Sequence, residues 1–238
     1  MSADPLATHT QSEMSPFDEW ALRLMLDTFG RRDLRILEIG SWFGAGSTRV
    51  FSDYARQVAC VDHWRGNENE VHRTLAGQVD PFAVFRRNTA PFRDKVVAVH
   101  ADSSLIPGLF APGSFDLVFI DGDHRYEQTR ADIANTLPLV KAGGILCGHD
   151  CEGRPTPANL AALRASIALD HTESTFINFK EMHPGVILAV DELLDDVQLF
   201  GERRVDLEID GRTKNGCSSI WYKRMPPPPA WRRLLGRA

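Results

Sequence analysis

The chain has few cysteines, no long apolar run and no basic excess. Its four cysteines (Cys60, Cys147, Cys151 and Cys217) lack the spacing of a disulfide framework, which predicts free thiols in a reducing compartment. No stretch approaches the roughly 18 to 20 apolar residues of a membrane span, and the start MSADPLATHTQSEM lacks a signal-peptide pattern. We therefore expect a cytoplasmic protein.

The balance of charge argues against a nucleic-acid partner. Lys and Arg number 27 against 32 Asp and Glu, for a formal net charge of −5, so no general basic field exists to hold a phosphate backbone. A small-molecule substrate is favoured instead. With 238 residues, 43% of them hydrophobic, the chain can form one sizeable core. We expect one domain over residues 15–225, a flexible tail over 1–14, and a proline-rich basic tail over 226–238.

Apolar strand patterns and helical patterns alternate from Leu34 onward. The strands are nearly continuous apolar runs, which is typical of parallel strands buried on both faces. This predicts a doubly wound α/β sheet. The expected strands are ILEI, VACVD, KVVAVH, FDLVFID and GGILCGHD, with helices near 45–56, 81–90, 104–110 and 126–139 between them.

Other segments flank this alternating region. Ser15, Pro16, Asp18 and Gly30 are the capping residues of a helix that covers one flank of the sheet. Residues 151–184 form an excursion with a helical pattern near 157–169, a candidate lid or a plain surface insertion, before HPGVILAVDELLDDV resumes as a helix. The runs VQLFGERRVDLEI and CSSIWYKRM predict a closing pair of strands separated by the turn-prone DGRTKNG.

A glycine loop follows the first strand. Gly40, Gly44 and Gly46 have the spacing GxxxGxG, not the GxGxxG of nicotinamide and flavin sites. Asp62 ends the second strand, where a carboxylate can accept both hydroxyls of an adenosine ribose. Glu38 is an acid in an apolar strand and needs hydrogen-bond donors, which the loop could supply. Together these residues indicate a nucleotide-type ligand.

Acidic groups follow two further strands. Asp121 and Asp123 end one, and His149 and Asp150 end the next. Carboxylates brought together at adjacent strand ends repel unless a proton or cation joins them, and Mg²⁺ prefers such oxygen ligands. A rival interpretation places Zn²⁺ on Cys147, His149 and Cys151, but on an unbroken strand these residues span about 13 Å at ~3.3 Å per residue.

The motifs EIGSWFGAGST, VDHW, ADSS and FIDGDHRYE…LVKAGGILCGHD, in this order, resemble the class I S-adenosylmethionine-dependent methyltransferases over residues 34–150. The IDGDH and GHD loops are most similar to metal-dependent O-methyltransferases of antibiotic sugars and to cephalosporin hydroxylase-like proteins. The resemblance implies a Rossmann-like seven-stranded sheet of order 3-2-1-4-5-7-6 with an antiparallel last strand. It also implies methyl transfer to a hydroxyl of a small, secondary-type metabolite.

The same resemblance implies roles for individual residues. Gly40, Gly44 and Ser47 (or Thr48) would line the methionine part of S-adenosylmethionine, and Asp62 would hold the ribose. Asp102 and Ser103 would lie against the adenine, and Glu38 and Asp121 complete the cofactor-binding candidates. Asp121 and Asp150 are the expected Mg²⁺ ligands, and the catalytic candidates are Asp121, Asp123 and His124.

Some residues and functions remain open from sequence. Trp64 could stack near the adenine or lie in the core, His183 could face the substrate or merely begin a helix, and Asp132 is expected on a solvated helix face. The alternative functions are a nucleotide-cofactor oxidoreductase or hydroxylase on a similar sheet, and a non-catalytic cofactor-binding protein. A homodimer is expected only by analogy with the class.

Overall fold

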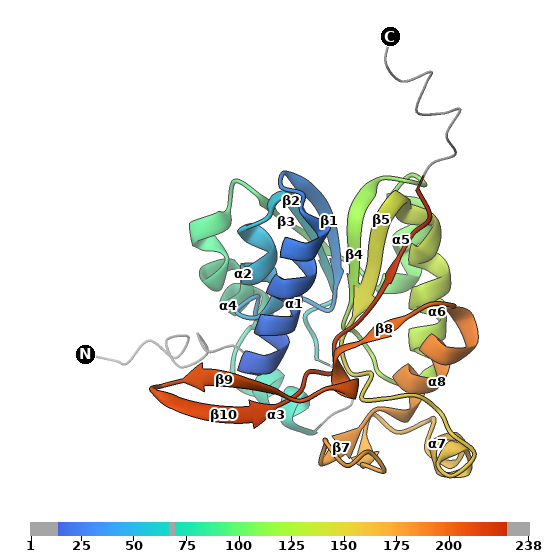
Figure 1. Ribbon diagram of the computed structural model, residues 1–238. Coiled ribbons are helices and arrows are strands. Elements are labelled where there is room, and N and C mark those ends of the chain that lie inside the picture. The colour runs from blue at the N-terminus through green and yellow to red at the C-terminus, as the bar shows by residue number, and fades with distance from the viewer. Residues whose placement is uncertain (1–13, 67–69, 228–238) are drawn as a thin grey trace.

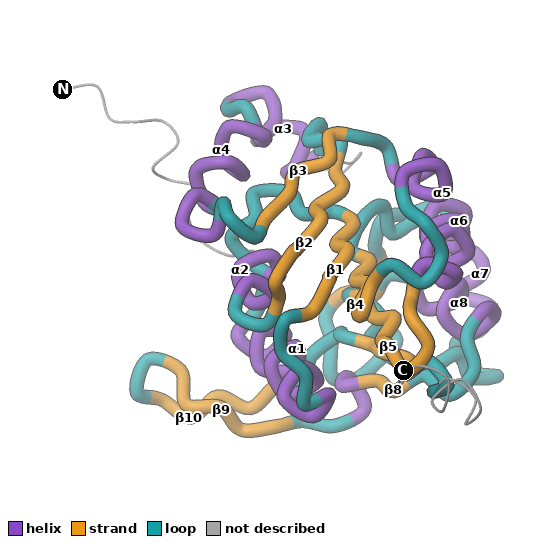
Figure 2. The backbone as a smooth tube through the Cα atoms, turned by 90° about the horizontal axis from the view of Figure 1, so that it is seen from above, coloured by secondary structure: helices purple, strands orange, loops and turns teal. Residues whose placement is uncertain are grey.

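A central sheet with helices on both faces forms the body of the protein (Figures 1 and 2). The computed structural model describes residues 14–66 and 70–227, so most of each expected tail lies outside the described residues. Within the described part, no helix combines the length and apolar character that crossing a membrane requires.

The seven-stranded sheet has the order β3-β2-β1-β4-β5-β11-β8, which confirms the predicted order. β1 to β5 are parallel and β11 is antiparallel to β5, as expected for the last strand. The strands are β1 (Leu34–Ile39), β2 (Ala55–Asp62), β3 (Val96–His100), β4 (Phe115–Ile120), β5 (Val140–Gly148), β8 (Gln198–Leu199) and β11 (Trp221–Arg224).

Two hydrophobic clusters cover the two faces of the sheet. Successive strand residues point to opposite faces, so Leu37 and Ile39 join one cluster and Ile36 joins the other. Because both faces are buried, the strands carry continuous apolar runs. One face packs under α1 (Pro16–Phe29), α2 (Ser47–Ser52) and α4 (Pro81–Asn88), and the other under α5 (Ile106–Leu109), α6 (Tyr126–Thr136) and α8 (Pro184–Leu193).

Helix α1 begins and ends where its capping residues predict. The side chain of Ser15 accepts a hydrogen bond from the Asp18 amide, the Asp18 side chain accepts one from the Ser15 amide, and Gly30 ends the helix at a φ of 68°. This reciprocal arrangement satisfies two amides that a helix start otherwise leaves without partners. Its buried side chains, such as Leu22 and Leu26, pack on the sheet.

The structure corrects the sequence prediction after β5. The excursion contains α7 (Leu160–Ala165), which packs on α8, and a small pair of strands, β6 (Thr172–Glu173) and β7 (Glu181–Met182). The expected closing pair is split, because β8 and β11 join the sheet while β9 (Val205–Ile209) and β10 (Arg212–Gly216) form a separate hairpin. Most of DGRTKNG is therefore strand β10. Helix α3 (Glu70–Gln78) was not predicted.

Candidate active site

The loops after β1 and β4 meet at the point where the strand order reverses, which is the usual ligand position of such sheets. The Asp121 amide donates to the Ile39 carbonyl (2.9 Å), and Gly40 has a φ of 80°. A Cβ atom on Gly40 would lie 1.8 Å from the Asp121 carbonyl oxygen. Glycine is therefore required at position 40 because the two loops cross there in direct contact.

Glu38 orders the glycine loop from inside the protein. This fully buried carboxylate accepts hydrogen bonds from the hydroxyls of Ser47 (2.5 Å) and Thr48 (2.6 Å) and from the thiol of Cys60 (3.3 Å). Burial raises the pKa of Glu38, and these three donors oppose the shift. Among these residues only Ser47 lines the cavity described below. Glu38 therefore supports the loop from beneath it.

The Asp62 carboxylate holds two loops, the one after β1 and the one after β2. Its two oxygens accept hydrogen bonds from the amides of Trp42 (2.8 Å) and Trp64 (2.6 Å). Each carboxylate oxygen can accept a second bond, so the pair can still receive two ribose hydroxyls. The Trp64 ring is buried among Phe82 and Phe85 and donates to the Trp42 carbonyl (2.8 Å), so it belongs to the core.

Asp102 and Ser103 lie where the adenine is expected. Next to them is Asp132, to which the sequence assigned no role in the site. The Asp102 carboxylate accepts a hydrogen bond from the Ser104 amide (2.9 Å), and the side chain and amide of Ser104 together lower its pKa. Gln128 donates to both Ser103 Oγ and Asp132 Oδ1 (3.0 Å each). Asp132 is buried, not solvated as predicted, and burial raises its pKa to about 6.

One cavity of about 630 Å³ joins the glycine loop to the acidic loop. It brings together nearly all of the predicted site residues, which come from the ends of the five parallel strands β1 to β5. Glu38 is the exception. The predicted residues that line the cavity are Gly40, Gly44, Ser47, Asp62, Asp102, Ser103, Asp121, Asp123, His124 and Asp150.

A cluster of alternating acids and imidazoles forms one end of this cavity. Asp150 lies 3.1 Å from His124 (Oδ2 to Nε2) and 3.1 Å from His149 (Oδ1 to Nδ1). Asp121 Oδ1 lies 3.7 Å from each of the same two nitrogens. His149 Nε2 in turn lies 3.3 Å from Asp18 Oδ2, so the start of α1 also reaches this cluster.

The charges in the cluster support one another. Burial opposes ionisation, but the neighbouring carboxylates, Asp150 foremost, raise the pKa of both His124 and His149 well above its usual value. Burial likewise opposes the charge of Asp150, and the imidazoles of His149, His183 and His124 hold its pKa well below the usual range. The protein thus holds protonated imidazoles between ionised carboxylates at neutral pH.

Asp123 differs from its neighbour Asp121. Arg125 donates from Nε to both oxygens of Asp123 (2.9 and 3.0 Å), and its Nη2 also contacts Oδ2. Burial opposes the charge, but these contacts lower the pKa of Asp123. A carboxylate bound in this way is a weak proton acceptor, so we infer that Asp123 orders its loop.

The sequence assigned no site role to several residues that lie around this cluster. His183, at the start of α8, lies 3.5 Å from Asp150 (Nδ1 to Oδ1) and 2.7 Å from Glu152 Oε1. Asp170 Oδ1 lies 3.0 Å from His124 Nδ1. His183, Glu152 and Asp170 all come from the excursion at 151–184, whose sequence carries no motif. Glu152 follows Asp150 closely in the chain, whereas His183 reaches Asp150 and Asp170 reaches His124 only when the excursion folds back onto the cluster.

The expected Mg²⁺ pair is brought together, but with nitrogen donors. Asp121 and Asp150 offer oxygens within 4.8 Å of one another, and the third ligand atom of that group is a nitrogen of His149. Mg²⁺ favours an octahedron of oxygens, so this donor set fits it poorly. The rival Zn²⁺ set, by contrast, is not assembled, because the thiols of Cys147 and Cys151 contact the carbonyls of Val118 and Gly153 instead.

Comparison with known proteins agrees with the geometry. Residues 37–151 match the family model described as "Methyltransferase domain" (Methyltransf_24). The structure of cofactor-bound Rv0187 from MTB superposes with a TM-score of 0.56 at 17% identity, covering 94% of this chain and 91% of that one. An O-methyltransferase from Bacillus cereus in complex with SAH gives a TM-score of 0.52 at 18% identity, covering 92% and 86%. Residues 37–151 are thus similar to a methyltransferase domain, and the chain has the fold of the S-adenosylmethionine-dependent methyltransferases.

Two further matches show what the fold leaves open. A tRNA (m1A58) methyltransferase from Aquifex aeolicus has a TM-score of 0.50 at 12% identity, over 90% of this chain and 71% of that one, so the fold alone does not select the acceptor. An uncharacterized protein of Sinorhizobium fredii, y4gI, is 24% identical over 204 residues. The match covers 77% of this chain, which spans about a fifth (21%) of that curated relative's length.

Proposed function

We propose that this domain transfers the methyl group of S-adenosylmethionine to a hydroxyl oxygen of a small metabolite. The observation that carries the proposal is the shared cavity, with a cofactor-type glycine loop at one end and the cluster of Asp121, His124 and Asp150 at the other. Methyl transfer needs these two ends together, because the acceptor oxygen must lie in line behind the methyl carbon.

The cofactor end is formed by backbone and carboxylates. Gly40 and Gly44 let the loop approach the methionine part of the cofactor closely, and Asp62 presents oxygens with free lone pairs toward a ribose. Asp102 and Ser103 lie one strand further along the sheet, where the adenine would extend. The SAH-bound relative from Bacillus cereus, which shares the fold, supports this assignment.

The acceptor end supplies groups that can receive a proton. Losing the hydroxyl proton makes the acceptor oxygen a better nucleophile, and a positioned acid-base group contributes roughly 100-fold to 10,000-fold to such a step. Asp121 is ionised and faces the cavity, and His124 lies beside it. We assign the proton-accepting role to Asp121, which the neighbouring imidazoles of His149 and His124 keep ionised, and a loop-ordering role to Asp123.

Two general features support a small acceptor inside the cell. The net charge of −5 gives no overall attraction for a phosphate backbone. All four cysteines are free, which suits a reducing compartment such as the cytoplasm.

The first experiment is thermal unfolding with S-adenosylhomocysteine or with NAD⁺. A ligand at about 100 times its dissociation constant stabilises by about 2.7 kcal/mol, a rise of roughly 5 to 10 °C in Tm for a chain of this length. We expect the rise with S-adenosylhomocysteine and none with NAD⁺. The reverse result would refute the methyltransferase assignment and favour an oxidoreductase.

The second experiment follows methyl transfer from labelled S-adenosylmethionine to a panel of hydroxylated small molecules. Once an acceptor is found, we expect Asp121→Asn to lower kcat at least about 100-fold and to keep the Tm rise with S-adenosylhomocysteine. Asp123→Asn should cost less, and Asp191→Asn, an exposed change on α8, is the control. Wild-type turnover by the Asp121→Asn protein would remove Asp121 from the reaction.

A further inference from the structure

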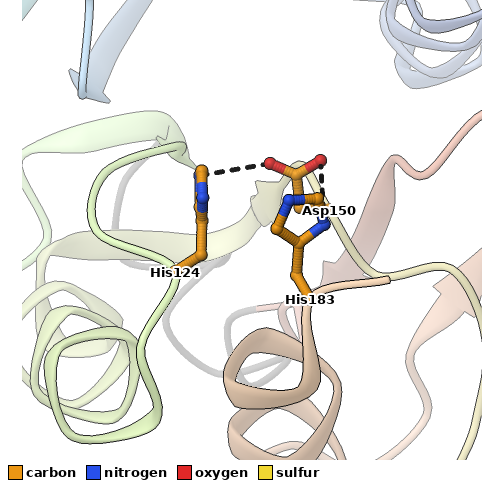
Figure 3. A group of neighbouring side chains, drawn as sticks. All are labelled: His124, Asp150 and His183. Carbon is orange, nitrogen blue, oxygen red and sulfur yellow. Dashed lines mark ion pairs between the residues drawn. The ribbon is translucent and has the colours of Figure 1, made fainter. Parts of the chain in front are cut away.

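Two imidazoles and a carboxylate converge beside the cofactor cavity, from three separate parts of the chain (Figure 3). His124 follows β4, Asp150 follows β5, and His183 begins α8. Each residue offers a ligand atom, and these atoms lie within 4.8 Å of one another. The two rings meet edge to face, with centroids 4.8 Å apart.

A further carboxylate supports each imidazole. Asp170 Oδ1 lies 3.0 Å from Nδ1 of His124, which leaves Nε2 directed at Asp150. Glu152, itself buried, accepts a hydrogen bond from the His183 amide (3.0 Å) and lies 2.7 Å from His183 Nδ1. Histidines that bind metal ions are typically held by a carboxylate on the other ring nitrogen, which fixes the direction of the ring. With Glu152 at Nδ1, Nε2 of His183 would be the ligand atom. Both rings are therefore held in place before any ion arrives.

We propose that His124, Asp150 and His183 bind one divalent first-row transition-metal ion, such as Zn²⁺, in preference to Mg²⁺. Imidazole nitrogen suits Zn²⁺ and its neighbours, whereas Mg²⁺ favours oxygen ligands. This set differs from the expected Asp121 and Asp150 pair because His183, which comes from the excursion, replaces Asp121. With the ion bound, both nitrogens of His124 are engaged, and Asp121 remains to face the acceptor.

Metal binding can be measured without any methyl acceptor. The full-length protein is stripped with a chelator, and titration calorimetry then follows Zn²⁺ or Mg²⁺ separately. We expect Zn²⁺ to bind with a stoichiometry of one and at least about 100-fold more tightly than Mg²⁺. His183→Gln should weaken Zn²⁺ binding at least about tenfold, since even outer contacts to a metal site are worth about 10 to 100-fold.

His171→Gln is the matched control. It removes an exposed imidazole whose ring lies 6.0 Å from that of His183 and which pairs with the other oxygen of Asp170. We expect it to leave Zn²⁺ affinity unchanged. Each variant is also tested for its Tm rise with S-adenosylhomocysteine, which reports on folding and on the proposed cofactor site independently of the metal. If His183→Gln does not fold, Asp150→Asn replaces it.

Three results would overturn the proposal. They are an absence of stoichiometric Zn²⁺ binding, equal affinity for Mg²⁺, and Zn²⁺ binding that survives His183→Gln or Asp150→Asn in folded protein. Loss of Zn²⁺ binding in His171→Gln alone would place the ion on the surface and overturn it equally. None of these results bears on methyl transfer, because cofactor binding is recorded separately.

Discussion

The buried carboxyl of Asp132 makes a contribution to the free energy of unfolding that falls as the pH rises. Asp132 is 1% exposed, and its hydrogen-bond partners Ser103 and Gln128 are both neutral, so they offset the cost of burying its charge only in part. Burial raises its pKa from 3.8 to about 6. The folded protein therefore holds this proton more tightly than the unfolded chain, and the folded state loses stability as the pH rises from about 4 through about 6.

The size of the effect follows from the two pKa values. The difference between about 6 and 3.8, at about 1.4 kcal/mol for each pH unit, gives a penalty of about 3 kcal/mol above pH 6. Asp132→Asn removes the ionisable group and keeps an oxygen for Gln128. We therefore expect the variant to match wild type at pH 4 and to exceed its free energy of unfolding by up to about 3 kcal/mol at pH 8.

Urea unfolding of both proteins at several pH values between 4 and 8 measures this difference directly. Subtracting wild type from the variant cancels all other titrating groups, and Asp94→Asn, at an exposed site, should differ from wild type by less than about 0.5 kcal/mol throughout. A difference for Asp132→Asn that is independent of pH, or that shrinks as the pH rises, would refute the reasoning.

Two other changes test the cofactor end of the cavity. Gly40→Ala places a Cβ 1.8 Å from the Asp121 carbonyl oxygen, so we expect a lower Tm and no Tm rise with S-adenosylhomocysteine. Gly77→Ala is the control, because a Cβ there meets nothing within 4 Å, and this variant should fold and bind S-adenosylhomocysteine. Asp62→Ala should raise the dissociation constant for S-adenosylhomocysteine at least about tenfold, by calorimetry, because it removes the proposed acceptors of the ribose hydroxyls. Unchanged affinity would move the ribose elsewhere, and Asp94→Ala is the control.

The parallel core of the sheet was predictable because its signal is local and repeated. A strand buried on both faces, such as β4 or β1, must carry an apolar run, and the capping residues of α1 satisfy amides within one turn. Beyond β5 the signal weakens. The sequence predicts one strand and a turn where the separate hairpin β9–β10 forms, because its polar residues 212–216 resemble a loop and only pairing with β9 makes them a strand.

The predicted site residues show the same limit. Strand ends and glycine spacing placed Gly40, Asp62 and Asp121 on one cavity, because parallel strands bring their carboxyl ends to one edge of the sheet. The burial of Glu38 under the loop, the capture of Asp123 by Arg125 and the burial of Asp132 depend on contacts that no spacing records.

The sequence by itself determined the doubly wound sheet and the strand-end loops that line the cavity, whereas its resemblance to a known family implied the cofactor. Each follows from residues close together in the chain, or from a strand end whose position the fold class fixes. Only the tertiary structure decided that His183 reaches Asp150 and Glu152, and that Asp18 of α1 reaches His149. Those contacts join residues far apart in the chain. They depend on how separate segments pack against the sheet, which no local pattern of residues records.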